Sequence, residues 1–439
     1  MTAVADPPLT IVLLAPASSP HTRRWADALG QAGHRVVVAS WQPGPKPAVA
    51  ALQVAPAPGS ALAWRLPLGA RWLRHLIREL HPDVVHVHSV GTYGLLSLAL
   101  PGGPGRPARV VTPWGSELRA ARGSSPRAAV ARLALRRADL VLPTSAEVAE
   151  EVSARYQVPR QRTEVLSWGV PEELITDLPA IRPESVRSAY GIPSNATVVL
   201  SVRSTTATYR VGDIVAAFAR AAAARPDLFL VLLVGHLPQG RLAGPAREAY
   251  LARVRAVTSR MAGQVLIVDR VLRPGEVFEL MCAADAAVSV PAADQRSSSV
   301  LEAALSGCRL LLSDIAPYRE MVRDGLAATL LAEPVRRSLA EVLARVRPGD
   351  RAAVADANQA FIRAHEHGAA KIAALEQIYY RVRRPGPAGR RDHAGGSAAI
   401  PRIVMSRRET AGFLVSGLKG RGRLPALGLT VRSRQTTWP

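Results

Sequence analysis

Short apolar runs alternate with longer amphipathic stretches along most of this chain. Runs of four to eight apolar residues are typical of buried strands, and apolar positions spaced three or four residues apart are typical of helices. Strands that are apolar on both faces and separated by helices predict a parallel sheet covered on both sides. The expected strands are Leu9–Leu14, Arg35–Ala39, Val84–His88, Arg109–Thr112, Leu140–Pro143, Glu164–Ser167, Thr197–Val202, Phe229–Val234, Val265–Val268, Ala286–Val290 and Arg309–Leu312.

The alternation is interrupted once, by an irregular stretch rich in Pro, Glu and Asp, which predicts two α/β domains. We expect a first Rossmann-like domain over residues 1–178, a linker over 179–195 and a second Rossmann-like domain over 196–350. Residues 351–383 are expected to form C-terminal helices that return to the first domain, and 384–439 a basic, disordered tail. Ligands of open α/β sheets bind at the carboxyl ends of the strands, so a cleft between the two domains is the expected site.

Composition excludes several classes of protein. With 48% hydrophobic residues the chain can bury a large core, which excludes a disordered basic protein. Two cysteines, Cys282 and Cys308, cannot build a disulfide framework, and no Cys/His spacing predicts a metal site. The run Leu9–Ala15 lacks the basic residues that open a signal peptide, and no apolar run is long enough to span a membrane. We therefore expect a cytoplasmic protein without a bound metal.

The net charge of +22 is unevenly distributed. From Arg383 onward, 12 basic residues face two acidic ones, so this end carries +10 of the total. The large excess of arginine over lysine is what GC-rich codons produce, and no nucleic-acid-reading module accompanies it, so we expect no nucleic-acid partner. A tail this basic could instead hold the protein at an anionic inner membrane face.

The most informative stretch runs from residue 285 to 320. A predicted strand ends near Pro291, a polar loop carries Asp294, and Ser297 or Ser298 can cap a helix that contains Glu302. A helix start offers unpaired amides to an anion such as a diphosphate, and Glu302, one turn on, could accept hydrogen bonds from a ribose. The alternative reading is an ordinary capped helix with a surface glutamate.

Asp294 and Glu302, with seven residues between them, resemble the acidic-x7-Glu motif of the family-four retaining glycosyltransferases with the GT-B fold. Most members have Glu at the first position, and Asp294 is similar to a subgroup with Asp there. The resemblance covers about residues 9–382 and implies an α/β fold of two Rossmann-like domains facing a cleft. Other segments in the family's order are Pro20–Trp25, Asp83–His88, Trp114–Glu117, Ala138–Val141, Trp168–Val170, Ser201–Ser204 and Val234-Gly235.

This resemblance implies donor-side roles for residues of the second domain. Glu302 would hold the donor ribose. Asp294 would approach the transferred sugar, and Arg203 would neutralise the diphosphate. Arg210 would replace the lysine that the family usually carries there. These last three form the expected catalytic group, and further donor-binding residues are expected to be Ser298, Ser299, Gly235, His236 and Val271.

On the acceptor side, the resemblance points to loops at the carboxyl ends of the first domain's strands. Trp114 stands where many relatives have histidine; it could stack on a sugar ring or simply pack beneath its loop. His86 is interpreted as a core histidine, and we expect it to point away from His88, so that the two could not share a metal ion. The expected acceptor-side residues are Ser19, His21, His88, Trp114, Ser116 and Glu117.

The activity implied is a retaining, metal-independent transfer, of the hexosyltransferase type and without a cofactor. The sugar would pass from a nucleotide-diphosphate sugar to a cell-surface polysaccharide, a lipid-linked acceptor or another glycan. Two alternatives are a catalytically degenerate scaffold that only binds the nucleotide sugar and a GT-B-like nucleotide-sugar epimerase.

Overall fold

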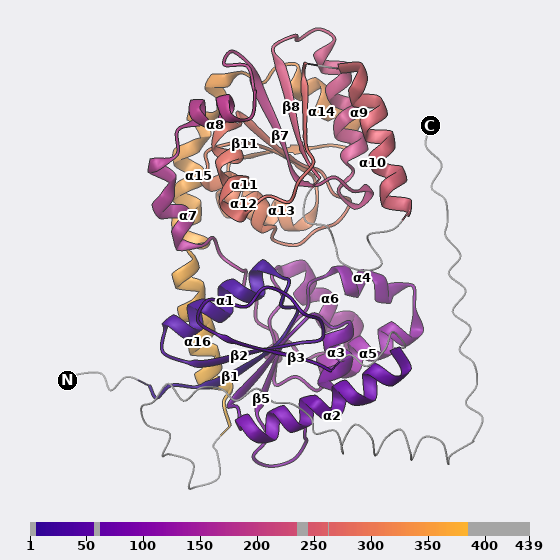
Figure 1. Cartoon of the computed structure of the whole chain (residues 1–439), viewed down its shortest axis with the longest axis vertical. Helices are drawn as coiled ribbons and strands as arrows, with labels where there is room; N and C mark the ends of the chain where they lie inside the picture. The colour runs from indigo at the N-terminus through magenta and orange to yellow at the C-terminus, as the bar shows by residue number, and fades with distance from the viewer. Residues whose placement is uncertain (1–5, 57–61, 235–244, 262, 385–439) are drawn as a thin grey trace, which may run out of the picture. The chain divides into compact units, whose positions relative to one another are not determined.

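A computed structural model describes residues 6–56, 62–234, 245–261 and 263–384. Within these residues the chain forms two six-stranded sheets, each covered by helices on both faces (Figure 1). All paired strands within them are parallel. The expected two-domain α/β fold is therefore confirmed. Gly235, His236 and the tail from residue 385 lie outside the described residues.

The first sheet has the strand order β3-β2-β1-β4-β5-β6. Its strands are β1 (Thr10–Leu14), β2 (Arg35–Ser40), β3 (Ala51–Val54), β4 (Val84–His88), β5 (Ala108–Thr112) and β6 (Leu140–Val141). Helices of this domain are α1 (Pro20–Gln31), α2 (Leu62–Leu80), α3 (Thr92–Ser97), α4 (Ser116–Arg122), α5 (Ser125–Arg136) and α6 (Ala146–Tyr156). The segment expected as a strand at Glu164–Ser167 is not a regular strand: Thr163 forms an isolated bridge to Val141, and the amides of Glu164 and Leu166 donate to the carbonyls of Val141 and Pro143.

The second sheet has the order β12-β11-β10-β7-β8-β9. Its strands are β7 (Thr197–Ser204), β8 (Leu228–Leu233), β9 (Val265–Val268), β10 (Ala286–Ser289), β11 (Arg309–Ser313) and β12 (Ala328–Leu331). Its helices are α9 (Val211–Ala222), α10 (Pro245–Thr258), α11 (Pro274–Ala283), α12 (Ser298–Leu305), α13 (Ala316–Arg323) and α14 (Val335–Leu343). Two helices, α7 (Glu172–Asp177) and α8 (Pro183–Ala189), lie between the domains in sequence. Short 3₁₀ turns occur at Arg160–Arg162, Leu178–Ala180, Ala207–Tyr209, Ser259–Met261 and Pro348–Arg351.

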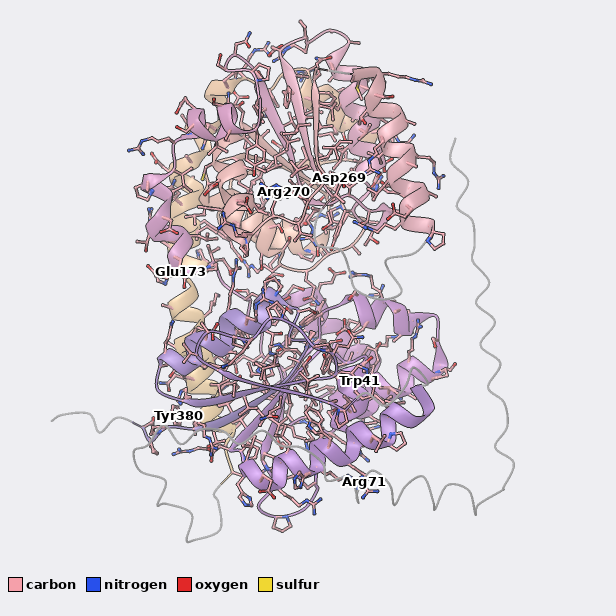
Figure 2. All side chains as sticks on the ribbon, viewed as in Figure 1. Trp41, Arg71, Glu173, Asp269, Arg270 and Tyr380 are labelled. Atoms are coloured by element: carbon pink, nitrogen blue, oxygen red, sulfur yellow. The ribbon has the colours of Figure 1, made fainter. Side chains whose placement is uncertain are left out.

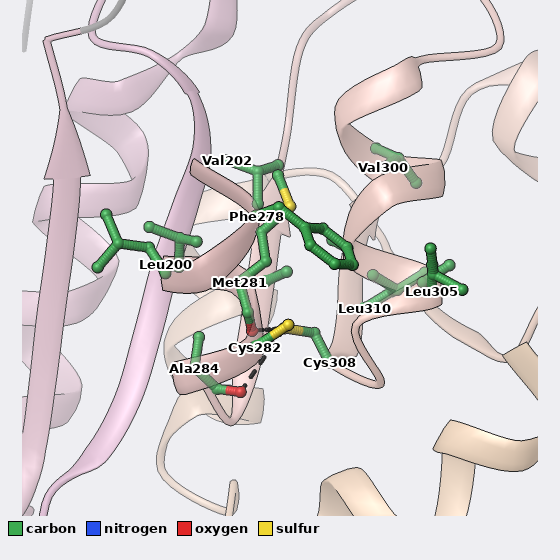
Figure 3. Close-up of a cluster of buried hydrophobic side chains, with 14 of the residues drawn as sticks. Leu200, Val202, Phe278, Met281, Cys282, Ala284, Val300, Leu305, Cys308 and Leu310 are labelled. Carbon is green, nitrogen blue, oxygen red and sulfur yellow. Dashed lines mark hydrogen bonds between the residues drawn. The ribbon is translucent and has the colours of Figure 1, made fainter. Parts of the chain in front are cut away.

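The core of the second domain packs α11 and α12 against the sheet (Figure 3). Phe278 and Met281 from α11 meet Leu305 from α12 in this core. Cys308 is fully buried among them, where its thiol donates to the Met281 carbonyl (3.0 Å), and burial raises its pKa to about 11. The thiol therefore stays protonated and serves as a small core residue, as expected.

The C-terminal stretch expected to be helical over residues 351–383 is divided into two helices. It forms α15 (Ala352–His365) and α16 (Gly368–Val382), with Glu366 and His367 between them. Phe361 of α15 packs in the second core, whereas Tyr379 of α16 is fully buried in the first. Tyr380, labelled in Figure 2, also packs against the first core and donates to the Pro7 carbonyl (3.1 Å). The chain thus returns to the first domain at Glu366. Among the described residues, no helix combines the length and the apolar character needed to cross a membrane.

Candidate functional site

Arg203 lies at the carboxyl end of β7, and its guanidinium contacts three side chains. Its Nη2 is 3.3 Å from Oδ2 of Asp294, its Nη1 donates to the Ser297 hydroxyl, and its guanidinium carbon lies 4.2 Å from the centre of the Tyr209 ring. Burial is the largest single effect and disfavours the charge on Arg203, but Asp294 together with Tyr209 and Tyr318 outweighs it, so the pKa of Arg203 is raised above its usual value. A positive charge is therefore held in place beside the loop that follows β10.

Asp294 is fixed from two further directions. Its Oδ2 accepts from the Tyr318 hydroxyl (3.0 Å), and its Oδ1 accepts from the backbone amide of Gln295 (2.9 Å). Tyr318 is fully buried beside Ser289, and burial together with the Asp294 charge raises the pKa of its hydroxyl well above the usual value. Tyr318 hence remains a hydrogen-bond donor and orients the carboxylate. No feature of the sequence had pointed to it.

The start of α12 lies directly beside this group. Ser297 is the N-cap residue, but its hydroxyl accepts from Arg203 instead of from an amide of its own helix. The Ser298 Oγ is buried without a hydrogen-bond partner. Because the first amides of a helix also have no partner within the helix, this end combines free donors, a positive dipole end and a guanidinium. An anion would be stabilised there.

Glu302 is not a surface residue. Only 12% of its side chain is exposed, and its Oε1 accepts from Nη1 of Arg24 on α1 at 3.0 Å. The reading of α12 as an ordinary capped helix with a surface glutamate is therefore wrong. Arg24 falls within the Pro20–Trp25 segment of the sequence, but its pairing with a residue 278 positions away was not predicted.

Arg210 and Val271, by contrast, are placed differently. The Arg210 side chain is held by Asp213 (2.8 Å) and Glu333 (2.5 Å), and these hydrogen bonds raise its pKa. It has left-handed backbone torsions, with φ of +52°, where it caps α9. Binding a phosphate through Arg210 would require exchange of one of these carboxylates. Val271 follows β9, with 50% of its surface exposed.

In the first domain, six ring-bearing residues form what we call the aromatic cluster. His21 stacks on Trp168 with ring centres 4.9 Å apart, and Trp168 lies 4.5 Å from Trp25 and 6.1 Å from Trp114. The remaining members are His86 and His88 of β4, whose ring centres are 4.7 Å apart. The expectation that these two histidines point apart is wrong, because residues two positions apart in a strand share a face. The cluster thus gathers three of the expected acceptor-side residues: His21, His88 and Trp114.

Hydrogen bonds orient the two strand histidines. His86 bonds to the Tyr379 hydroxyl (2.7 Å) and to the Thr112 hydroxyl (2.8 Å), which confirms it as a satisfied core histidine. His88 bonds through Nδ1 to Thr22 (3.3 Å), while its Nε2 is buried and unpartnered. The Trp114 Nε1 is likewise buried without a partner. Two ring-edge nitrogens of the cluster, His88 Nε2 and Trp114 Nε1, are therefore without a hydrogen-bond partner.

Burial keeps the histidines of the cluster neutral. Burial first, and then the charges of Arg24 and Arg203, lower the pKa of His21 to about 3. Burial and His21 lower the pKa of His88 to about 3, and that of His86 also falls well below its usual value. At neutral pH the cluster therefore contributes no charge, and the positive potential of the site comes from its arginines.

Acidification is expected to destabilise the fold because of these histidines. Below about pH 6.5 the unfolded chain binds protons that the folded chain excludes, which favours unfolding. The fold therefore has its full stability with respect to these histidines above about pH 6.5 and loses it progressively as the pH falls toward 3. Each pH unit in that window should cost about 1.4 kcal/mol of free energy of unfolding for the fully buried His88. Urea unfolding followed by circular dichroism between about pH 7 and pH 5 measures the slope. His88→Asn should flatten it, whereas His75→Asn, at a side chain that is 36% exposed, should not; equal slopes in all three proteins would refute this account.

Ser19, Ser116 and Glu117 form local contacts. The Ser19 hydroxyl caps α1 by accepting from the Thr22 amide (3.4 Å). Glu117 accepts from the backbone amides of Trp114 (2.6 Å) and Val90 (3.1 Å), and Ser116 donates to its other oxygen (3.2 Å). The Glu117 carboxylate therefore holds the loops after β4 and β5 together. To bind an acceptor hydroxyl, as predicted, it would have to share or exchange these partners.

The loop after β10 also contacts the first domain. Gln295 accepts from the Thr144 hydroxyl and donates to the Pro113 carbonyl (3.4 Å). Gly115 lies against it: a Cβ on Gly115 would fall 2.5 Å from Gln295 Nε2, and its φ of +76° also favours glycine. Together with the Arg24–Glu302 pair, these contacts place the Arg203 group and the aromatic cluster on facing loops. Within the described residues, His, Cys, Asp and Glu side chains form no group of three or more that could hold a metal ion.

Part of the chain matches a known protein family. Residues 19–174, which span most of the first domain, match the model of Glycosyltransferase Family 4. A comparison with curated proteins found no match.

Solved structures resemble the chain over nearly all its described length. Sucrose-phosphate synthase from Thermosynechococcus elongatus superposes with a TM-score of 0.69 at 18% identity, covering 85% of this chain and 98% of that one. HepE from Anabaena, in complex with UDP and glucose, gives 0.67 at 16% identity, covering 85% and 99%. A glycosyltransferase from Rickettsia africae gives 0.65 at 14% identity, covering 86% and 99%. The chain thus has the GT-B fold of these structures, with a Glycosyltransferase Family 4 match in its first domain.

Proposed function

We propose that this protein is a retaining glycosyltransferase that moves a sugar from a nucleotide-diphosphate sugar to a glycan or lipid-linked acceptor. The observation that carries the proposal is the group formed by Arg203, Asp294, the start of α12 and Glu302. It offers a fixed cation and helix amides to a diphosphate, and a carboxylate one turn away to a ribose. HepE, of the same fold, is a protein whose structure holds UDP and glucose.

Breaking the bond between sugar and phosphate leaves negative charge on the departing nucleoside diphosphate. Preorganised donors aimed at developing charge are a large contribution to catalysis. Arg203 and the first amides of α12 supply such donors, so the proposed transfer needs neither a metal ion nor a cofactor. Asp294, held by Arg203 and Tyr318, would bind hydroxyls of the transferred sugar. The acceptor would attack on the face from which the diphosphate leaves, and the diphosphate oxygen would take its proton.

The aromatic cluster is proposed as the acceptor side. Neutral rings with spare hydrogen-bonding atoms, at His88 Nε2 and Trp114 Nε1, suit an uncharged sugar ring better than an anionic group. The acceptor would be a cell-surface polysaccharide or lipid-linked glycan at the cytoplasmic face of the membrane, with the tail beyond residue 384 as a candidate membrane contact. A scaffold that binds the donor without turnover is the second candidate, because Arg210 is already paired with two carboxylates.

A thermal-shift screen with UDP-, GDP-, ADP- and CDP-sugars tests the donor site. One nucleotide class should raise the unfolding temperature, since a ligand at about 100 times its Kd adds about 2.7 kcal/mol of stability. Glu302→Gln should abolish the shift, whereas Glu341→Gln, at an exposed helix position paired with Arg337, should keep it. Asp294→Asn should lower sugar transfer more than nucleotide binding.

Three outcomes separate the candidates. A shift that depends on Glu302, together with transfer or donor hydrolysis, supports the transferase. The same shift without any turnover identifies the binding scaffold, and release of an epimerised nucleotide sugar would identify an epimerase. No shift with any nucleotide sugar would contradict the donor site itself.

A further inference from the structure

A second basic site lies at the amino ends of β5 and β6. A pocket of about 660 Å³ opens there, of a size typical for a small-ligand site. Six arginines and a single carboxylate line it, so the lining carries 6 − 1 = +5. We call it the arginine pocket; its charged residues are Arg106, Arg109, Arg136, Arg137, Arg162, Arg384 and Asp139.

The single carboxylate is already fully used. Asp139 accepts two hydrogen bonds from Arg106, each of 2.8 Å, and one from Arg384, also of 2.8 Å. It further accepts from the backbone amide of Arg109 at 2.8 Å. Asp139 therefore offsets one of the positive charges and has no capacity to neutralise the others.

Three of the other four arginines donate to backbone carbonyls. Arg162 donates to the Ala138 carbonyl (3.1 Å), and Arg137 to the Leu98 carbonyl (3.3 Å). Arg109 is only 7% exposed, donates through Nη2 to the Leu100 carbonyl (3.0 Å), and has a buried Nε without a partner. Burial, and next the neighbouring charge of Arg106, lower the pKa of Arg109 to about 10. Arg109 is thus a buried guanidinium with an unused donor and no carboxylate bonded to its side chain. Because a buried charge without a partner is costly, a bound anion would stabilise it.

This pocket is separate from the donor group. Arg109 is the second residue of β5, and Asp139 directly precedes β6, so both lie at the amino edge of the first sheet. Trp114 and His88 lie at or beyond the carboxyl ends of β5 and β4, at the opposite edge. A ligand of the arginine pocket would therefore not compete with one bound between the two facing loops.

We propose that the arginine pocket binds a phosphate group, carried either by a small phosphorylated molecule or by the headgroup of a phospholipid. Guanidinium groups match phosphate oxygens in pairs, and a doubly charged group offsets the excess charge better than a single carboxylate. The two sources share this chemistry and differ only in what the phosphate is attached to.

The test compares two pairs of substitutions on the same helix. Arg136→Gln/Arg137→Gln removes two charges from the pocket at exposed positions around the end of α5. Arg127→Gln/Arg132→Gln removes two exposed charges from α5 outside the pocket and serves as the matched control. Pyrophosphate binding is measured by titration calorimetry in an Arg203→Ala background, which weakens competing binding at the donor group. Cosedimentation of the unaltered full chain and of both pairs uses phosphatidylcholine vesicles with and without phosphatidic acid.

The expected result is a pyrophosphate Kd raised about tenfold or more by the pocket pair and unchanged by the control pair, which identifies a small phosphorylated ligand. If free pyrophosphate does not bind, but sedimentation with phosphatidic acid is lost in the pocket pair alone, the phosphate belongs to a lipid. The proposal is overturned if neither probe binds, or if the pocket pair weakens binding no more than the control pair does, because general surface charge or the basic tail would then explain the binding.

Discussion

Replacing Arg203 by alanine is expected to lower kcat/KM for sugar transfer by about 10²- to 10³-fold, the usual effect of removing a preorganised donor from a developing anion. The substitution removes the guanidinium that contacts Asp294, the Ser297 hydroxyl and the Tyr209 ring. Asp294 would then repel the departing diphosphate without a compensating cation. Initial rates of transfer or donor hydrolysis, with the nucleotide sugar selected by the thermal-shift screen, measure the loss.

Two further variants make this result specific. Arg203→Lys keeps the charge but loses the planar fork that reaches Asp294 and Ser297 together, so an intermediate rate is expected. Arg220→Ala removes an exposed arginine from α9 of the same domain and should leave the rate unchanged. Wild-type rates in Arg203→Ala would remove Arg203 from the site, and equal losses at Arg203 and Arg220 would point to general electrostatics.

Glu366→Ala is expected to lower the free energy of unfolding by about 2 kcal/mol, because it removes a buried ion pair with Arg296 and leaves the buried Ser167 hydroxyl without its acceptor. Arg296 keeps Glu320 and Asp324 as partners, so its charge is not left unpaired. Glu366 is fully buried where the chain returns to the first domain. Its Oε1 lies 3.0 Å from Arg296 Nε, in an ion pair without a well-aligned hydrogen bond, and its Oε2 accepts from the Ser167 hydroxyl at 2.5 Å. Arg296 comes from the loop between Asp294 and the start of α12, so the change should also disturb the donor group.

Urea unfolding of both variants measures the effect of Glu366 against a matched control. Glu164→Ala removes the partner of Arg381, and with 43% and 58% of these side chains exposed, the cost should stay below about 1 kcal/mol. Glu366→Gln keeps the shape and the Ser167 hydrogen bond and should fall between the two. If Glu366→Ala unfolds at the same urea concentration as Glu164→Ala, the buried pair does not stabilise the return to the first domain.

The interior strands could be predicted closely. Val84–His88 has the same bounds in the sequence prediction and in the structure, and Arg309–Leu312 ends one residue before β11 does, because strands with neighbours on both sides keep continuous apolar runs. The two strands that the pattern missed, β3 (Ala51–Val54) and β12 (Ala328–Leu331), are both at sheet edges. Each contains a polar residue, Gln53 or Thr329, and so lacks the fully apolar run that marks the edge strand β9 (Val265–Val268).

The sequence thus determined the two parallel α/β domains, the helix start that follows Asp294 and the residues that end the strands, because these depend on neighbours along the chain. The tertiary structure alone decided which side chains meet. It paired Glu302 with Arg24, placed Tyr318 on Asp294 and gathered Trp168 with His88. It also directed Glu117 to backbone amides and Arg210 to two carboxylates. Most of these contacts join residues tens to hundreds of positions apart. The partner of a carboxylate or guanidinium depends on which groups the packed domains place next to it, and a local sequence pattern does not contain that information.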